Sequence, residues 1–122
     1  MSREAVRQAF KTAAATAYSG PIFTTRQNDH RENAEFLCIY ISNGDVNHSF
    51  NGIETEATLY IQLTKHNATD AALDSAMDAI NTALLSHDDV ISAVKFAKQE
   101  SFEYGIESTN APSLTYSYKI LF

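Results

Sequence analysis

Residues 53–85 contain the pattern that most constrains the fold, an alternating run that continues into an amphipathic helix. Over residues 53–63 the odd positions are mostly apolar and the even positions are polar or aromatic. Successive side chains of a strand point to opposite faces, so the run predicts a strand with one buried face and one solvent-facing side. In the segment opened by Thr69 and Asp70, apolar residues then recur on one helical face: Leu73, Met77, Ile80 and Leu84. We therefore expect an antiparallel sheet with this helix packed across it.

The composition fits such a core. The chain has 122 residues, of which 44% are hydrophobic and 20% charged, as expected for one globular domain spanning residues 1–122. No apolar run approaches the roughly 18 residues of a membrane span. The N-terminus lacks a signal-peptide core, so we expect a protein kept in a cytoplasm. Cys38 is the single cysteine, which excludes an intrachain disulfide and a thiolate metal cluster.

The net charge of −6 is spread unevenly along the chain. Residues 1–31 hold five basic and two acidic residues, a balance of +3, whereas residues 32–122 hold four basic and thirteen acidic residues, a balance of −9. A surface dominated by the second part would repel nucleic acid. The basic N-terminal part is either a solvated helix or a surface that faces an acidic partner or a neighbouring copy.

Two more helices and four more strands are expected around the central pair. They are helix 3–18, strands 22–25, 36–41, 101–106 and 114–122, and a short helix that includes Val90, Ile91, Val94 and Phe96. Residues 26–35 are a polar loop, and turn signals at 43–45 and 51–52 flank a short extended excursion. The strand over 101–106 is expected to be half-buried. The order predicts an α+β fold, with a mixed or antiparallel sheet of about four to five strands and helices packed on it.

Two features point beyond the monomer's own core. If residues 53–65 are fully extended, they span roughly 43 Å at about 3.3 Å per residue, more than the typical strand of about 5–6 residues, so one end projects. Strand 36–41 is apolar on both faces, and Tyr60 lies on the solvent-facing side of its neighbour. Either the first helix or a second subunit is expected to cover that second face.

The residues that carry chemistry are scattered. His30, His48, His66 and His87 fall in four separate predicted loops without zinc-site spacing. Cys38 sits in a buried strand pattern with no base nearby in the sequence, which favours a small core residue over a nucleophile. No glycine-rich phosphate loop and no nucleophile elbow occur. We therefore expect no catalytic, cofactor-binding or metal-binding residues, and no enzyme.

Asp70, Asp74 and Asp78 form an acidic seam at steps of four beside the apolar helical stripe. Each like-charge pair at that spacing costs on the order of 0.2–0.5 kcal/mol. Asp70 is offset by its place at the helix N-terminus. We weigh two interpretations: a solvated flank that keeps the protein soluble, or a docking edge for a basic surface or a loosely held divalent cation.

The sequence resembles the tail-terminator family of long-tailed, lambda-like phages, the minor tail protein U type. The likeness runs over nearly the whole chain, from the N-terminal helix through the residue patterns at 22–23, 36–44, 57–63, 69–74, 102–104 and 114–118. These are patterns of spacing and residue type rather than catalytic signatures. The chain departs from the family at Leu37, where a proline often stands, and over residues 44–52.

The resemblance implies a structural protein without an active site or cofactor. Six copies would form a ring on the end of the finished tail tube, stop the addition of tube subunits, and present a surface for head joining. The implied partners are further copies of the chain, the tail tube protein and a head-completion or connector protein. The implied place is the virion tail, after assembly in the host cytoplasm. An acidic ring bore would let DNA pass without binding, since like charges repel.

Two other classes of function stay open. One is a different neck or head-completion component of the same virion, and the other is a small enzyme or ligand-binding domain. The residues we select as candidate contacts in an assembly lie in the polar loop, at the first turn signal, at the start of the long strand and on the acidic seam. They are Arg26, Asp29, His30, Arg31, Asn43, Gly44, Asp45, Glu54, Glu56, Asp70, Asp74 and Asp78.

Overall fold

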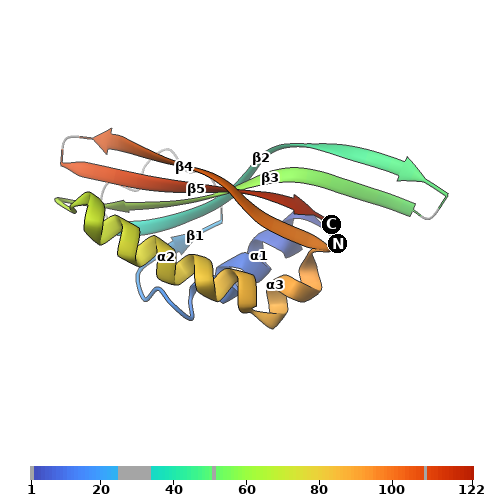
Figure 1. Ribbon diagram of the computed structural model, residues 1–122, viewed down its shortest axis with the longest axis horizontal. Coiled ribbons are helices and arrows are strands. Elements are labelled where there is room, and N and C mark those ends of the chain that lie inside the picture. Colours follow the sequence, from blue (N-terminus) through green and yellow to red (C-terminus); the bar gives the residue numbers. More distant parts are fainter. Residues whose placement is uncertain (1, 25–33, 51, 109) are drawn as a thin grey trace.

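The computed structural model describes residues 2–24, 34–50, 52–108 and 110–122. Three helices and five strands follow in the predicted order (Figure 1). Their bounds are α1 Arg3–Ala14, β1 Ile22–Phe23, β2 Glu35–Ser49, β3 Gly52–Lys65, α2 Asp70–Ser86, α3 Asp88–Ala93, β4 Phe96–Ser108 and β5 Ala111–Leu121. The predicted α+β class is confirmed.

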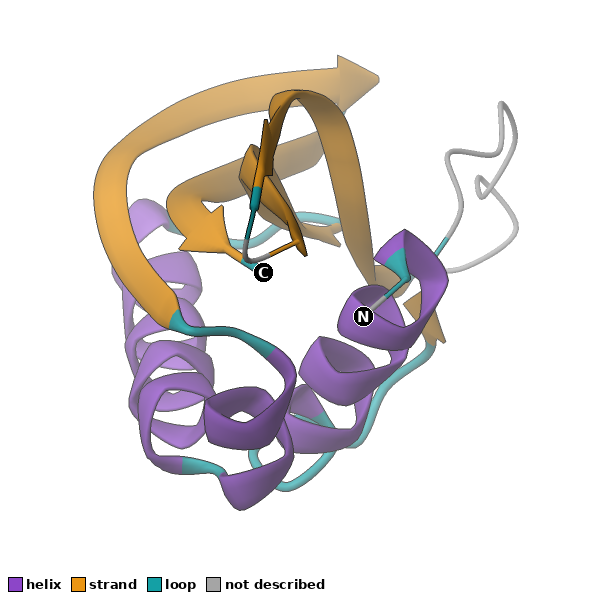
Figure 2. Cartoon of the chain, turned by 90° about the vertical axis from the view of Figure 1, so that its right-hand side faces the viewer, coloured by secondary structure: helices purple, strands orange, loops and turns teal. Residues whose placement is uncertain are grey.

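The strands form one mixed sheet in the order β1-β2-β3-β5-β4. The short β1 pairs parallel to β2, and the remaining neighbours are antiparallel. The three helices of the described residues lie on one side of this sheet, and within those residues the other side carries no helix (Figures 1 and 2). The first helix therefore shares a layer with α2, so our alternative that α1 covers the second face of strand 36–41 is wrong.

The core lies between the sheet and the helix layer, as the alternating run predicts. On β3 the odd positions from Ala57 to Leu63 are buried, and so is the apolar stripe of α2. Burial of an aliphatic side chain contributes about 1.5–3 kcal/mol, so this pairing supplies much of the stability. The side chains concerned are Ala57, Leu59, Ile61, Leu63, Leu73, Met77, Ile80 and Leu84.

Helix α1 begins at its expected residue but ends about one turn earlier than expected. The hydroxyl of Ser2 accepts a hydrogen bond from the amide of Ala5 at 3.1 Å, which caps the free N–H groups of the first turn. The helix ends at Ala14 rather than at residue 18, and the amide of Ala17 bonds to the Ala14 carbonyl in the turn that follows. The buried Phe10 ring meets Tyr118 of β5 edge-on, with ring centroids 6.5 Å apart.

The structure corrects two expectations about the C-terminal half. Helix α3 ends at Ala93, and Phe96 begins β4 instead of extending the helix, because its backbone pairs with Leu121 of β5. The strand expected to be half-buried over 101–106 is exposed along its length. It lies in β4, an edge strand, where side chains that point toward the helix side are only partly covered.

The first turn signal, 43–45, is not a turn. Strand β2 continues through it with one register shift between Ile41 and Asn43, and it pairs with β3 as far as Ser49. Gly44 sits directly opposite Ala57, where a Cβ atom would come within 2.6 Å of the Glu56 carbonyl oxygen. Glycine is therefore used here for close backbone approach rather than for a turn. His48, which we expected in a loop, lies in β2.

We expect Phe10→Ala to lower the free energy of unfolding by about 3–5 kcal/mol, because the ring is fully buried under the sheet. Urea denaturation followed by circular dichroism measures the change. The control is Ile91→Ala on the exposed side of α3, where a change within about 0.5 kcal/mol is expected. Equal losses for the two variants would contradict this assignment of the core.

Candidate functional site

The most prominent functional feature is the β2–β3 hairpin, which extends well beyond the helix layer (Figure 1). We call its outer part, residues 46–54, the hairpin arm. Val46 and Ile53 expose 54% and 64% of their surface, and Phe50 is fully exposed. The sequence predicted that one end of the long strand projects, and this prediction is confirmed. Exposed apolar side chains of this kind mark interaction surfaces.

Two ion pairs hold the base of the arm. Lys95 Nζ lies 3.1 Å from Glu54 Oε2, and Lys119 Nζ lies 2.7 Å from Glu56 Oε1. The hydrogen bond to Glu56 raises the pKa of the Lys119 ammonium. Both glutamates are half-exposed, so solvent screens each pair and its contribution to stability is small. Glu54 and Glu56, which we selected as contacts to a neighbour, are thus engaged by lysines of their own chain.

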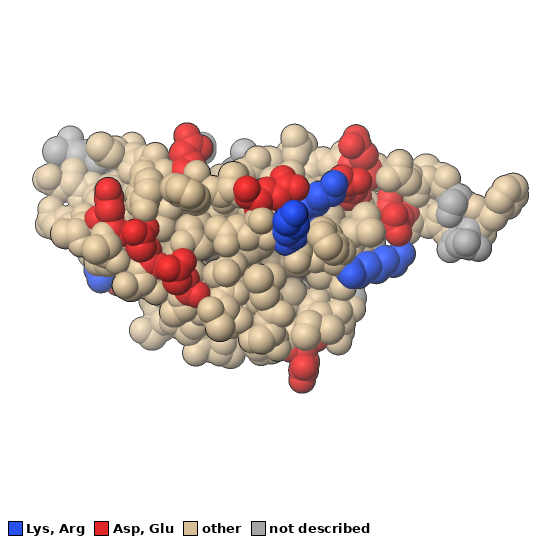
Figure 3. All heavy atoms as spheres, in the orientation of Figure 1, with Lys and Arg blue, Asp and Glu red and all other residues tan. Residues whose placement is uncertain are grey.

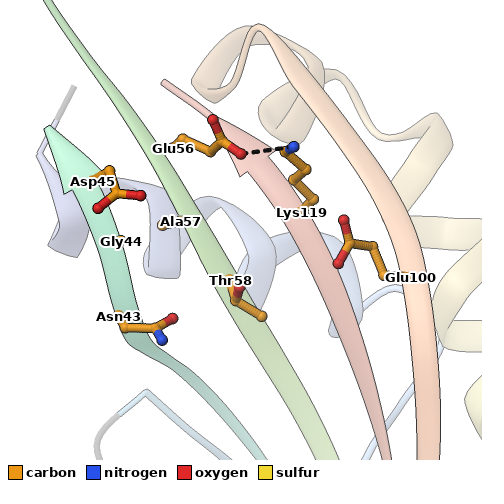
Figure 4. Close-up of a pocket in the computed structure, with 8 residues that line it drawn as sticks. All are labelled: Asn43, Gly44, Asp45, Glu56, Ala57, Thr58, Glu100 and Lys119. Atoms are coloured by element: carbon orange, nitrogen blue, oxygen red, sulfur yellow. Dashed lines mark ion pairs between the residues drawn. The ribbon is translucent and has the colours of Figure 1, made fainter. Parts of the chain in front are cut away.

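A polar hollow opens on the helix-free face beside the Glu56–Lys119 pair (Figure 4). Four strands contribute to it, and its lining residues are Asn43, Gly44, Asp45, Glu56, Ala57, Thr58, Glu100 and Lys119. The lining contains neither a cysteine nor a histidine, so it offers no nucleophile paired with an imidazole base. Within the described ranges, no group of three or more His, Cys, Asp or Glu side chains could hold a metal ion.

The acidic seam is partly an intramolecular contact. Tyr104 of β4 donates a hydrogen bond from its hydroxyl to Asp74, and Tyr116 of β5 donates one to Asp78 at 2.7 Å. Acidic side chains gather along the first half of α2 (Figure 3). The seam therefore fastens the helix to the sheet, and Asp70 extends it toward the start of the helix.

A third tyrosine completes this contact. The hydroxyl of Tyr118 donates to Asn81 Oδ1 at 2.7 Å, so the acceptors Asp74, Asp78 and Asn81 follow one another at helical spacing. Sequence reasoning predicted the last strand over 114–122 and the acidic seam of α2 but did not pair them. The signal available in the sequence was a pair of tyrosines at alternate positions of one strand, together with hydrogen-bond acceptors spaced by four and three residues on one helix.

These contacts perturb the tyrosine pKa values. The hydrogen bond to Asp74 raises the pKa of Tyr104 to about 12. Burial is the main cause that raises the pKa of Tyr116 and of Tyr118 above their usual range. In each case the neutral phenol is favoured in the folded state, since ionisation would place a negative charge in a buried or acidic environment.

The remaining candidates are separated in space or not described. Arg26, Asp29, His30 and Arg31 lie outside the described residues. His48 is on the hairpin arm and His66 follows β3, whereas His87 caps α3 by accepting a hydrogen bond from the amide of Asp89. Cys38 is buried in β2.

The helix-free face also carries an aromatic pair. Tyr40 of β2 and Tyr60 of β3 are stacked, with ring centroids 5.2 Å apart and planes 18° apart. Both are partly exposed beside a second hollow that includes Glu103 and Thr115. Because α1 lies in the other layer, these rings belong to an open surface.

None of the helices in the described ranges combines the length and apolar character that crossing a membrane would require.

Comparison with known proteins gives a likeness of fold to solved structures. No protein-family model matches the chain, and no curated protein matches it. A solved structure described as the "virion of native gene transfer agent (GTA) particle" contains a chain of similar fold, with a TM-score of 0.54 and 13% sequence identity. The match covers 98% of this chain and 94% of that chain. The α+β arrangement is therefore shared over almost the full length of both chains.

We expect Gly44→Ala to lower the free energy of unfolding by about 1–3 kcal/mol, because the new methyl group would collide with the Glu56 carbonyl oxygen and with Ala57. Chemical denaturation measures the loss. Asn47→Ala, on the exposed part of the same strand, is the control and should change stability by less than about 0.5 kcal/mol. Full stability of the Gly44 variant would show that the two strands separate there without cost.

We expect Tyr118→Phe to flatten the alkaline loss of stability. Above about pH 10 an unfolded chain loses the phenol proton that the folded chain retains, so each such tyrosine lowers the free energy of unfolding as pH rises, by about 1.4 kcal/mol per pH unit. The pKa of Tyr118 is raised by its burial, so the variant lacks one such contribution. Denaturation midpoints measured from pH 8 upward would give parallel curves if Tyr118 did not contribute.

Proposed function

We propose that this chain is a structural virion protein that closes the end of a phage-like tail tube as a ring. The observation that carries the proposal is the fold likeness to a chain of a gene transfer agent virion, which extends over 98% of this chain. The resemblance of the sequence to tail terminators gives the finer assignment. In this assignment residues 1–122 are one terminator-like domain, and six copies surround the tube end.

The surfaces of the molecule support an assembly role. The hairpin arm exposes Val46, Phe50 and Ile53 to solvent, and a monomer gains nothing from that exposure. The polar hollow, by contrast, lacks the paired nucleophile and imidazole that acyl transfer would need. An enzyme or ligand-binding domain is therefore the weaker alternative, and the proposed activity needs no cofactor.

The helix-free face supports a place for DNA in the assembly. Asp45, Glu100 and Glu103 are exposed on the strands, and the chain as a whole has a net charge of −6. A ring whose bore is lined by such a face repels the phosphate backbone and lets DNA pass without binding. The proposed protein partners are the tail tube protein on one side and a head-completion or connector protein on the other. The proposed location is the virion tail, after assembly in the host cytoplasm.

A second candidate is another neck or head-completion component. The fold likeness favours it equally, since it is to a component of a whole virion particle rather than of a stated tail element. The two candidates differ in the partner alone: a terminator binds the end of the tail tube, whereas a neck component binds the head side.

We expect the purified protein to shorten tail tubes when it is added during polymerisation, because a bound ring blocks the next subunit. Electron microscopy measures tube length, and gold-labelled protein locates the binding site, which is expected at one tube end only. The Ile91→Asp variant, changed on the exposed side of α3, serves as a control for nonspecific effects of a surface substitution. Unchanged length with no end label would refute the terminator role, and label on head connectors alone would favour the neck component.

A further inference from the structure

A second hollow on the helix-free face lies at the end of the sheet away from the hairpin arm, and we call it the tyrosine hollow. It measures about 330 Å³ and is open to solvent. The stacked tyrosine pair of β2 and β3 lies on one side of it, Glu103 of β4 lies on the other, and residues of β5 lie between them. The lining includes Tyr40, Tyr60, Glu103, Gly105, Ser113 and Thr115.

One face of the Tyr60 ring is directed into this hollow. Its other face stacks on Tyr40. Because the two stacked rings come from neighbouring strands, the second face of Tyr60 is directed along the sheet toward β5. The β5 residues beside it are Ser117 and Thr115, and neither is large enough to cover an aromatic ring. Tyr60 is therefore only partly buried.

The hollow carries a negative charge. Glu103 is the one charged side chain among the described residues that line it. Glu103 is exposed and forms no ion pair with another described residue. Two lysines of this face, Lys98 and Lys119, lie opposite each other farther along β4 and β5, and Lys119 is paired with Glu56. A group that enters the tyrosine hollow thus meets a carboxylate and an aromatic face.

We infer that the tyrosine hollow binds the guanidinium group of an arginine that a different protein of the assembly inserts into it. The face of an aromatic ring attracts a cation. A guanidinium group is planar and its N–H bonds lie in that plane, so it stacks on Tyr60 while its edge donates hydrogen bonds to Glu103. An ammonium group has no plane and cannot make both contacts in this way.

The hydroxyl groups of the hollow suit the same ligand. Ser113 and Thr115 supply oxygens that accept hydrogen bonds, and Glu103 supplies two more. A guanidinium group has five N–H donors and no acceptor, so its needs match this lining. A phosphate or carboxylate group would instead be repelled by Glu103 and would find no positive side chain among the described lining residues.

The open shape favours a protein side chain over a small-molecule ligand. Small-molecule sites bury about 70–90% of the surface of their ligand, whereas this hollow lies open on the sheet. It can hold the end of a side chain whose other contacts come from the protein that carries it. The negative charge that repels DNA in the proposed function attracts a basic protein surface. The inference rests on the proposed function for the place of that partner in an assembly.

Titration with a capped Gly-Arg-Gly peptide, followed by NMR of the protein, tests the hollow directly. We expect saturable shifts of the Tyr60 ring and of the Thr115 amide. A Gly-citrulline-Gly peptide is the matched control, because its urea group has the shape of a guanidinium group without the charge. We expect it to bind at least about twofold to fivefold more weakly. Equal binding of the two peptides, or tighter binding of a Gly-Lys-Gly peptide, would overturn the inference.

Two variants locate the binding. Tyr60→Leu removes the ring and Glu103→Gln removes the charge, and we expect each to weaken arginine binding about twofold to fivefold. Glu100→Gln is the control, since its site is exposed on the same strand but does not line this hollow. Circular dichroism establishes that the variants are folded, and Glu103→Gln alone decides if Tyr60→Leu is not. Binding that is unchanged in Glu103→Gln would contradict the assignment.

Partner binding separates this inference from the proposed function. We expect Glu103→Gln to bind tube ends or head connectors, whichever the unchanged protein binds, more weakly than Glu100→Gln does. Equal binding would overturn the assignment of the arginine to an assembly partner. So would a Glu103→Gln variant that loses only self-association in sedimentation velocity, because the arginine would then come from a second copy. If the unchanged protein caps tubes but binds no arginine peptide, the function stands and the inference is wrong.

Discussion

The burial of one face of the sheet under a single helix layer is the constraint on which the other surfaces depend. The apolar stripe of α2 packs against β3 and β5, and α1 fills the rest of the layer. Because all three helices are on that side, the opposite face of a five-stranded sheet remains open. The layer ends before the outer part of the β2–β3 hairpin, so the hairpin arm extends past it (Figure 1).

Polar contacts refine this packing rather than create it. Three tyrosine hydroxyls from β4 and β5 reach acceptors on α2 at Asp74, Asp78 and Asn81. The directionality of these hydrogen bonds fixes how the helix lies across the strands. The aspartates of α2 would repel one another in an isolated helix. In the folded protein Asp74 and Asp78 accept hydrogen bonds from tyrosine hydroxyls. The aspartates of the seam also make this side of α2 acidic (Figure 3).

A protein that assembles head to tail needs two different surfaces whose apolar side chains are not covered by its own chain. The hairpin arm and the exposed side chains of β4 (Phe102, Tyr104 and Ile106) are two such surfaces. Head-to-tail contact between unlike surfaces is the geometry that closes into rings. Under the proposed function the molecule would act through its neighbours, and its exposed apolar side chains are the surfaces available for that contact.

Local patterns in the sequence determined the α+β class, the order of all eight elements, the core of β3 and α2, and the projection of the long strand. These depend on side-chain periodicity and chain length, which are local quantities. Tertiary structure decided the rest. Phe96 begins a strand because its backbone pairs with β5. Gly44 is part of a strand rather than a turn because the backbone there lies close to β3. The tertiary structure also places Glu54 and Glu56 beside lysines, and it brings the hydroxyl of Tyr116 within hydrogen-bond distance of Asp78. Each of these contacts joins residues distant in sequence, and only the packing of the whole chain determines which distant residues meet.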